Sequence, residues 1–214
     1  MGGGAVTERV IIGDSCVAEG VEWLCANDPM MAHAYAQTGL LPLRLQPEGF
    51  AQLFSAIISQ QVSVASANAI WKRLQEAAMT EPHQVAATSE DALRDLGLSR
   101  QKARYASALA KADIDYGALR DASTEQVINT LTAVTGIGAW TAEIYAMFSL
   151  GRADVFASGD LALQEAARIL YQLPERPRDK ALRVMAEKWQ PWRAVAARQL
   201  WAYYRIAKDR DGIR

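Results

Sequence analysis

The hydrophobic pattern of this chain repeats with the period of an α-helix almost from end to end. Apolar residues recur three and four positions apart, and the one stretch that suggests a strand is the short Val10-Ile11-Ile12. This pattern predicts an all-α protein. The expected helices cover residues 20–26, 30–37, 49–59, 64–78, 82–87, 90–96, 100–112, 124–133, 139–150, 161–170, 178–189 and 191–208.

Two of these helices carry clear start signals. Ser89 precedes Glu90 and Asp91, which suits the positive end of a helix, and Gly97 follows where a left-handed stop is expected. Ser123 and Gln126 have the spacing of a capping box.

The chain is long enough to bury a sizeable core without covalent cross-links, because it has 214 residues of which 50% are apolar. We expect one folding unit over residues 1–214, built from two helical lobes with a cleft between them. The lobes would cover residues 31–139 and residues 1–30 plus 140–214, with a flexible leader at residues 1–4.

Composition narrows the possible functions. Cys16 and Cys25 are the two cysteines, too few for a disulfide framework or a four-cysteine metal site. No apolar run approaches the ~20 residues that cross a bilayer, and no secretory signal opens the chain. We therefore expect a cytoplasmic protein with no membrane partner. We also expect a monomer. A formal net charge of −1 argues against binding nucleic acid by bulk electrostatics, so any such site must be local.

A short glycine turn joins two of the expected helices. Between residues 124–133 and 139–150 the chain reads Val134-Thr135-Gly136-Ile137-Gly138. Glycines permit a tight helix-hairpin-helix, with Ile137 tucked into the junction. The second helix would present unpaired N–H groups that can hold an anion, such as a phosphate of a nucleic-acid backbone. A plain interhelical turn remains the alternative.

Several ordered motifs together resemble one family. The segments are residues 54–65 (FSAIISQQVSVA), 96–103 (LGLSRQKA), 134–148 (VTGIGAWTAEIYAMF), 154–164 (DVFASGDLALQ), 189–193 (WQPWR) and 200–201 (LW). They resemble the helix-hairpin-helix DNA glycosylases, and within these the DNA-3-methyladenine glycosylase II type, over about residues 48–206. The resemblance implies base excision repair, with duplex DNA containing alkylated bases as the partner.

The resemblance makes Asp160 the catalytic residue. Its carboxylate would stabilise the positive charge that develops on the sugar as the N-glycosidic bond breaks, and would orient or deprotonate the attacking water. The 3-methyladenine and 7-methylguanine nucleosides are already cationic and need no separate general acid. Taken alone, Asp160 could simply be the N-cap of the helix at 161–170. Asp154 is interpreted as a structural hydrogen-bonding residue.

Trp140 separates two mechanisms within the resemblance. Relatives that also cleave the strand carry a lysine at the corresponding place, which forms a Schiff base with the sugar. Tryptophan there predicts a monofunctional glycosylase without lyase activity.

The resemblance also suggests how the base and the DNA are held. An extruded base is usually held between aromatic rings, and Trp140, Trp201, Phe54 and Tyr145 are the candidates, with core packing as the alternative for each tryptophan. Gln61, with Gln60 beside it, would fill the gap left in the duplex, although a simple polar loop would look the same. The expected phosphate contacts are Thr135, Gly136, Ile137, Gly138, Thr141, Arg100 and Lys102, where Arg100 and Lys102 could equally belong to a solvated face.

No cofactor is expected, and no side chains form a metal site, since His33 and His83 stand alone. Family hairpins often hold a monovalent cation on backbone carbonyls, here those around Thr135, Gly136 and Gly138. Two other functions stay open: a noncatalytic DNA-binding module, and a glycosylase of the same fold for deaminated or oxidised bases.

Overall fold

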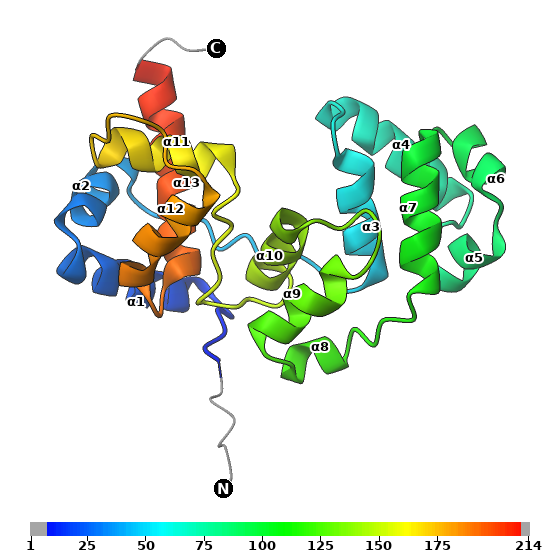
Figure 1. The fold of residues 1–214 in the computed structure, drawn as a ribbon, viewed down its shortest axis with the longest axis horizontal. Helices are drawn as coiled ribbons and strands as arrows, with labels where there is room; N and C mark the ends of the chain where they lie inside the picture. Colours follow the sequence, from blue (N-terminus) through cyan, green and yellow to red (C-terminus); the bar gives the residue numbers. More distant parts are fainter. Residues whose placement is uncertain (1–7, 211–214) are drawn as a thin grey trace, which may run out of the picture. The chain divides into compact units, whose positions relative to one another are not determined.

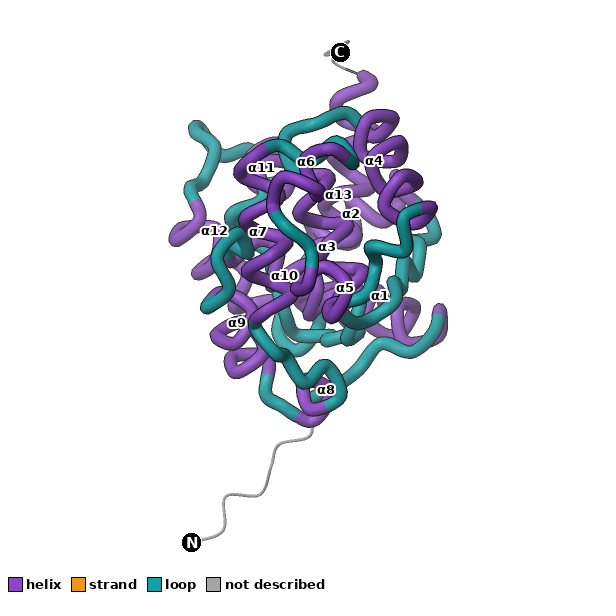
Figure 2. Tube along the Cα trace, turned by 90° about the vertical axis from the view of Figure 1, so that its right-hand side faces the viewer, coloured by secondary structure: helices purple, strands orange, loops and turns teal. Residues whose placement is uncertain are grey.

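The computed structural model describes residues 8–210. Figure 1 and Figure 2 show helices joined by loops, and no strand is present in residues 8–210. The strand-like Val10 forms an isolated bridge with Arg152. The prediction of an all-α protein is therefore confirmed, while the leader at residues 1–4 lies outside the described residues.

The chain divides into two compact units. Unit 1 comprises Met1–Leu45 with Ala146–Arg214, and unit 2 comprises Gln46–Tyr145. These boundaries differ from the expected lobes, because residues 31–45 belong to unit 1 and residues 140–145 to unit 2. Two packing interactions explain the difference. Helix α2 (Pro29–Thr38) packs on helices of unit 1, and the Tyr145 hydroxyl accepts a hydrogen bond from the Gly49 N–H at 2.8 Å within unit 2.

Unit 1 is arranged around its last helix. This helix, α13 (Arg193–Arg210), contacts α1 (Asp14–Asn27), α2 and α11 (Leu161–Leu170) (Figure 1). The approach of α1 is close: a Cβ placed on Gly20 would lie 2.7 Å from Val195. Unit 1 also contains α12 (Asp179–Met185) and the 3₁₀ helix η1 (Ala186–Trp189).

Unit 2 contains the helices between these segments. They are α3 (Phe50–Ser59), α4 (Val64–Glu76), α5 (Pro82–Ala87), α6 (Glu90–Asp95), α7 (Arg100–Lys111), α8 (Ala118–Asp121), α9 (Thr124–Thr132) and most of α10 (Ala139–Phe148). In α3, Phe50, Leu53, Phe54, Ile57 and Ile58 are buried, the spacing of a helix with one apolar face. Helix α7 packs against α3, α5 and α6.

Most expected helix ends agree with the structure. The Ser89 hydroxyl caps α6, Gly97 has a φ of 107°, and Ser123 and Gln126 form the expected capping box on α9. The last helix begins at Arg193, so the prediction that Pro191 opens it was wrong. The first half of α1 and the single turn α8 were not predicted.

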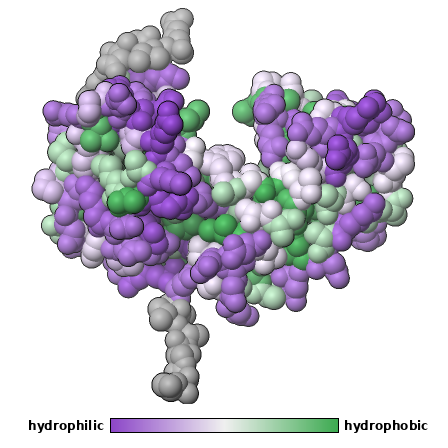
Figure 3. Space-filling view, viewed as in Figure 1, coloured by the Kyte–Doolittle hydropathy of each residue, from purple (hydrophilic) through white to green (hydrophobic). Residues whose placement is uncertain are grey.

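The surface of each unit is mainly hydrophilic on the face shown in Figure 3. Among residues 8–210, no helix combines the length and apolar character that a membrane span requires.

Candidate active site

The glycine turn forms the expected hairpin between α9 and α10 in unit 2. The Ile137 N–H donates to the Val134 carbonyl at 3.0 Å, and the Ile137 side chain is 4% exposed. This confirms that Ile137 packs into the junction between the two helices.

The two glycines of the hairpin have different roles. Gly136 has a φ of 102°, and a Cβ there would lie 2.3 Å from Cγ of Tyr105. Gly136 is therefore required by the fold. A Cβ on Gly138 would meet no atom within 4 Å, so the protein presents an open backbone where a phosphate could approach the start of α10.

The other predicted phosphate-binding residues of the hairpin differ in exposure. Thr135 is exposed, whereas Thr141 is 7% exposed. The side chains of Ile137 and Thr141 are therefore largely covered, and the Ile137 N–H is already bonded to the Val134 carbonyl. Of the carbonyls proposed for a cation, that of Gly136 accepts from Gln60 Nε2 at 3.2 Å and that of Gly138 accepts from the Ala142 N–H at 3.1 Å.

The predicted wedge lies in the turn between α3 and α4. Gln61 is exposed and has a φ of 56°, a conformation that costs a non-glycine residue energy and that often marks a functional position. Gln60 points back to the hairpin through its bond to Gly136. Ser63 then caps α4 by accepting from the Ser66 N–H.

The two basic residues predicted to bind phosphate lie in different surroundings. Arg100 is exposed at the first position of α7. Lys102 is buried, and its Nζ donates to the Ile58 carbonyl at 2.7 Å. Burial lowers the pKa of this ammonium group. Lys102 thus has a protein partner for one of its three N–H donors.

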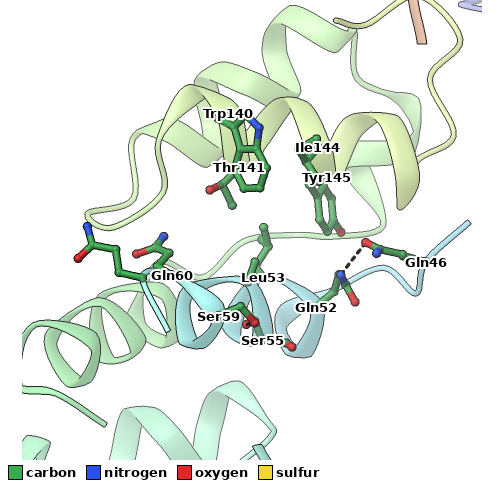
Figure 4. A pocket seen from close by; sticks show the side chains of 12 residues that line it. Gln46, Gln52, Leu53, Ser55, Ser59, Gln60, Trp140, Thr141, Ile144 and Tyr145 are labelled. Carbon is green, nitrogen blue, oxygen red and sulfur yellow. Dashed lines mark hydrogen bonds between the residues drawn. The ribbon is translucent and has the colours of Figure 1, made fainter. Parts of the chain in front are cut away.

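A cavity of about 490 Å³ opens between α3 and α10 within unit 2. Trp140, Thr141, Ile144 and Tyr145 of α10 lie on one side, and Leu53 and other residues of α3 lie on the other (Figure 4). Trp140 is 46% exposed. The remaining lining residues are Gln46, Gln52, Ser55, Ala56, Ser59, Gln60 and Gln61.

Phe54 is not part of the cavity lining. Its ring is fully buried and packs edge-on against Trp71 and tilted against Phe50. Its position favours core packing over the predicted base contact. Tyr145 lines the cavity, and burial raises the pKa of its hydroxyl.

Asp160 begins α11 in unit 1. Its Oδ1 accepts from the backbone N–H groups of Ala162 at 2.9 Å and Leu163 at 3.0 Å. Asp160 is therefore an N-cap, as the simpler interpretation proposed. These two bonds fix the orientation of the carboxylate at the positive end of a ten-residue helix.

Trp201 lies beside Asp160. Its indole N–H donates to the same Oδ1 at 3.2 Å, and its ring packs on Phe148 at 5.8 Å between centroids. The structure thus brings Asp160 and Trp201 together in unit 1, and Trp140 and Tyr145 together in unit 2. The hydrogen bond from Trp201 was not predicted from the sequence.

The loop before Asp160 is held by residues that sequence reasoning missed. The buried side chain of Gln164 donates to the Ser158 carbonyl at 2.9 Å, and the Ser158 hydroxyl donates to Asp179 at the start of α12. Gln164 lies one helical turn after Asp160, and this spacing could have pointed to it. Asp154 makes a bidentate ion pair with Arg193 at 2.6 and 2.9 Å, which confirms its structural role.

Within residues 8–210, no cluster of three or more His, Cys, Asp or Glu side chains could hold a metal ion.

Comparison with known proteins shows what this arrangement is similar to. Residues 54–193 match the HhH-GPD superfamily of base excision DNA repair proteins. A DNA-3-methyladenine glycosidase structure from Bacillus halodurans is 34% identical, with a TM-score of 0.81 over 89% of this chain and 91% of that one.

A second structure is a 3-methyladenine DNA glycosylase from Schizosaccharomyces pombe in complex with abasic DNA. It is 28% identical, with a TM-score of 0.74 over 86% of this chain and 95% of that one. DNA-3-methyladenine glycosylase 2 of Escherichia coli is 30% identical over 72% of this chain. The chain spans 57% of the length of that relative and 60% of the length of another from Bacillus subtilis.

The family match covers most of the chain, includes the hairpin and Asp160, and agrees with the structural similarity. The chain belongs to the HhH-GPD superfamily of base excision DNA repair proteins, among the DNA-3-methyladenine glycosylases.

Proposed function

We propose that this protein is a monofunctional DNA glycosylase that acts as a monomer on duplex DNA. It would hydrolyse the N-glycosidic bond of alkylated bases of the 3-methyladenine and 7-methylguanine type. The proposal is supported by the family of the chain and by a relative whose structure contains abasic DNA, since abasic DNA is what base removal leaves behind.

The observation that carries the proposal is the hydrogen bonding of Asp160. Three N–H donors converge on Oδ1, from Ala162, Leu163 and Trp201. They hold a carboxylate in a fixed orientation before any substrate arrives. A preorganised negative charge stabilises a sugar that becomes positive in the transition state, because no reorganisation is needed as the bond breaks.

The exposed ring of Trp140 fits a cationic base. A positive charge over an indole face is stabilised by about 0.5–2 kcal/mol, depending on how far it is desolvated. A base that already carries a charge also leaves without a general acid. Trp140 stands where strand-cleaving relatives are expected to carry lysine, so no amine is available at this position for a Schiff base.

The decisive experiment uses methylated duplex DNA and measures free base and strand nicking separately. We expect 3-methyladenine and 7-methylguanine to be released without nicks before alkali treatment. Asp160→Asn should slow release by about a hundredfold or more while DNA binding persists. Binding without release from any lesion would favour a noncatalytic module, and a borohydride-trapped adduct would refute the absence of lyase activity.

A further inference from the structure

The turn that contains Gln61 is held on two sides. Residues 60–62 follow the last helical residue of α3, Ser59, and precede the α4 cap at Ser63. One contact comes from α7 and the other connects to the glycine hairpin. Together with that hairpin, the turn and the start of α7 line a second cavity of about 700 Å³ in unit 2.

The contact from α7 is made by Lys102. Its ammonium group donates to the carbonyl of Ile58, which lies in the last turn of α3. Carbonyls in the last turn of a helix have no donor within the helix, and a cation there also interacts favourably with the helix dipole. Lys102, on α7, therefore caps the C-terminal end of α3. The carbonyl that it caps, that of Ile58, lies two residues before the turn.

The contact to the hairpin is made by Gln60. Its amide group donates to the Gly136 carbonyl at 3.2 Å. The position of Gly136 is itself fixed, because its backbone lies directly against the ring of Tyr105. Tyr105 and Lys102 are three residues apart on α7, so they project from the same side of that helix.

These contacts connect α7, the turn and the hairpin to one another. Helix α7 fixes the end of α3 through Lys102 and the hairpin through Tyr105, and Gln60 joins the turn to the hairpin. Between them, Gln61 has a backbone conformation that non-glycine residues rarely adopt. Such a conformation persists only where the surrounding structure holds it in place.

We propose that Lys102 and Gln60 are positioning residues that hold the Gln61 turn and the glycine hairpin as one rigid body. Gln61 then enters the duplex at a fixed distance from the phosphate that the hairpin binds. This inference rests on the proposed function, because it assigns Gln61 to the gap left by an extruded nucleotide. Neither Lys102 nor Gln60 needs to contact DNA for this role.

The test measures insertion of Gln61 without relying on catalysis. A duplex carries a tetrahydrofuran abasic analogue with 2-aminopurine beside it, and insertion raises the 2-aminopurine fluorescence. Anisotropy gives the affinity for this duplex relative to an undamaged one. If the wild type releases no base but still shows the fluorescence rise, the proposed function fails while the positioning roles remain testable.

Lys102→Met and Gln60→Leu should each lower the preference for the abasic duplex by about tenfold, towards the value of Gln61→Ala. Affinity for undamaged DNA is measured beside it, and Lys111→Met, which removes the same charge from α7, gives the loss expected from charge alone. In the Gln61→Ala background, Lys102→Met should add no further loss, since it acts through Gln61.

Lys111→Met on the same helix and Gln75→Leu on α4 are matched controls, since both side chains are exposed. Circular dichroism melts check that each variant is folded, and if Lys102→Met is not, Gln60→Leu decides the question. Folded variants that keep the wild-type preference would overturn the proposal. Losses that add in full to that of Gln61→Ala would do the same.

Discussion

Replacing each glycine of the hairpin by alanine, which adds one methyl group, distinguishes the roles of the two positions. Gly136→Ala places a Cβ 2.3 Å, 2.6 Å and 2.7 Å from three atoms of Tyr105, at a φ of 102°. Gly138→Ala places a Cβ where no other atom lies within 4 Å. The first variant tests what the fold needs, and the second tests what a ligand needs.

The cost of Gly136→Ala has two parts. The backbone conformation costs a residue with a side chain about 1–3 kcal/mol. Moving the Tyr105 ring away costs about another 1–3 kcal/mol, the usual range for overpacking. The sum of about 2–6 kcal/mol should lower the melting temperature by roughly 5–20 °C for a chain of this size. Gly138→Ala should leave stability unchanged or raise it by up to about 1 kcal/mol, because alanine restricts the unfolded chain.

Calorimetry and DNA-binding anisotropy together check this difference. Gly138→Ala should weaken duplex binding by about tenfold, because a methyl group would keep a phosphate from the N–H groups at the start of α10. The reasoning would be refuted if Gly136→Ala melted within about 2 °C of the wild type. It would also be refuted if Gly138→Ala lowered stability and left DNA affinity intact.

Further predictions concern the site in unit 1, the cavity and the packing of unit 1. Asp160→Asn and Asp160→Ala should both slow base release by about a hundredfold or more, but only alanine should also lose about 1 kcal/mol of stability in denaturant unfolding, because asparagine still caps α11. Trp201→Phe keeps the ring packed on Phe148 and removes the indole donor, so single-turnover release should fall by about tenfold with DNA affinity unchanged. Trp140→Ala should weaken binding of a duplex with a cationic lesion base by about 2–30-fold relative to one with an abasic analogue, measured by competition anisotropy. For Asp28, burial opposes ionisation, but hydrogen bonds from Tyr171, Lys188 and Trp189 outweigh it and lower the pKa; the stability that Asp28→Asn loses at pH 7 should therefore shrink as the pH falls from about 4, the ordinary pKa of an aspartate, through the lower pKa of the carboxyl in the folded protein.

Local signals predicted much of the fold. The apolar spacing in α3 and the capping box at Ser123 act within one or two helical turns, so they can be read from neighbouring residues. The turn α8 was missed because four residues carry no periodicity. The boundaries of the two compact units differ from the expected lobes because they depend on long-range contacts, such as that between Tyr145 and Gly49, which are 96 residues apart.

The same holds for the site: features set by neighbouring residues could be predicted, and features set by distant residues could not. The position of Asp160 at a helix start could be predicted from the sequence, and so could the position of Ile137 between the glycines. The hydrogen bond from Trp201 spans 41 residues, and that from Lys102 to Ile58 spans 44. A sequence shows that a lysine lies on a helix, but whether it meets solvent or a carbonyl of another helix depends on tertiary packing.

The cavity beside Trp140 has one ionisable lining group within the described chain, Tyr145, and burial shifts the titration of that phenol further into the alkaline range. Its walls therefore keep one charge state from mildly acidic to mildly basic solution. Any change of slope in a plot of release rate against pH across this interval would come from ionisable groups outside the cavity wall or from the lesion base itself. Lesion bases that differ in their own protonation could then be compared in one buffer series, in which the charge of the cavity wall stays constant.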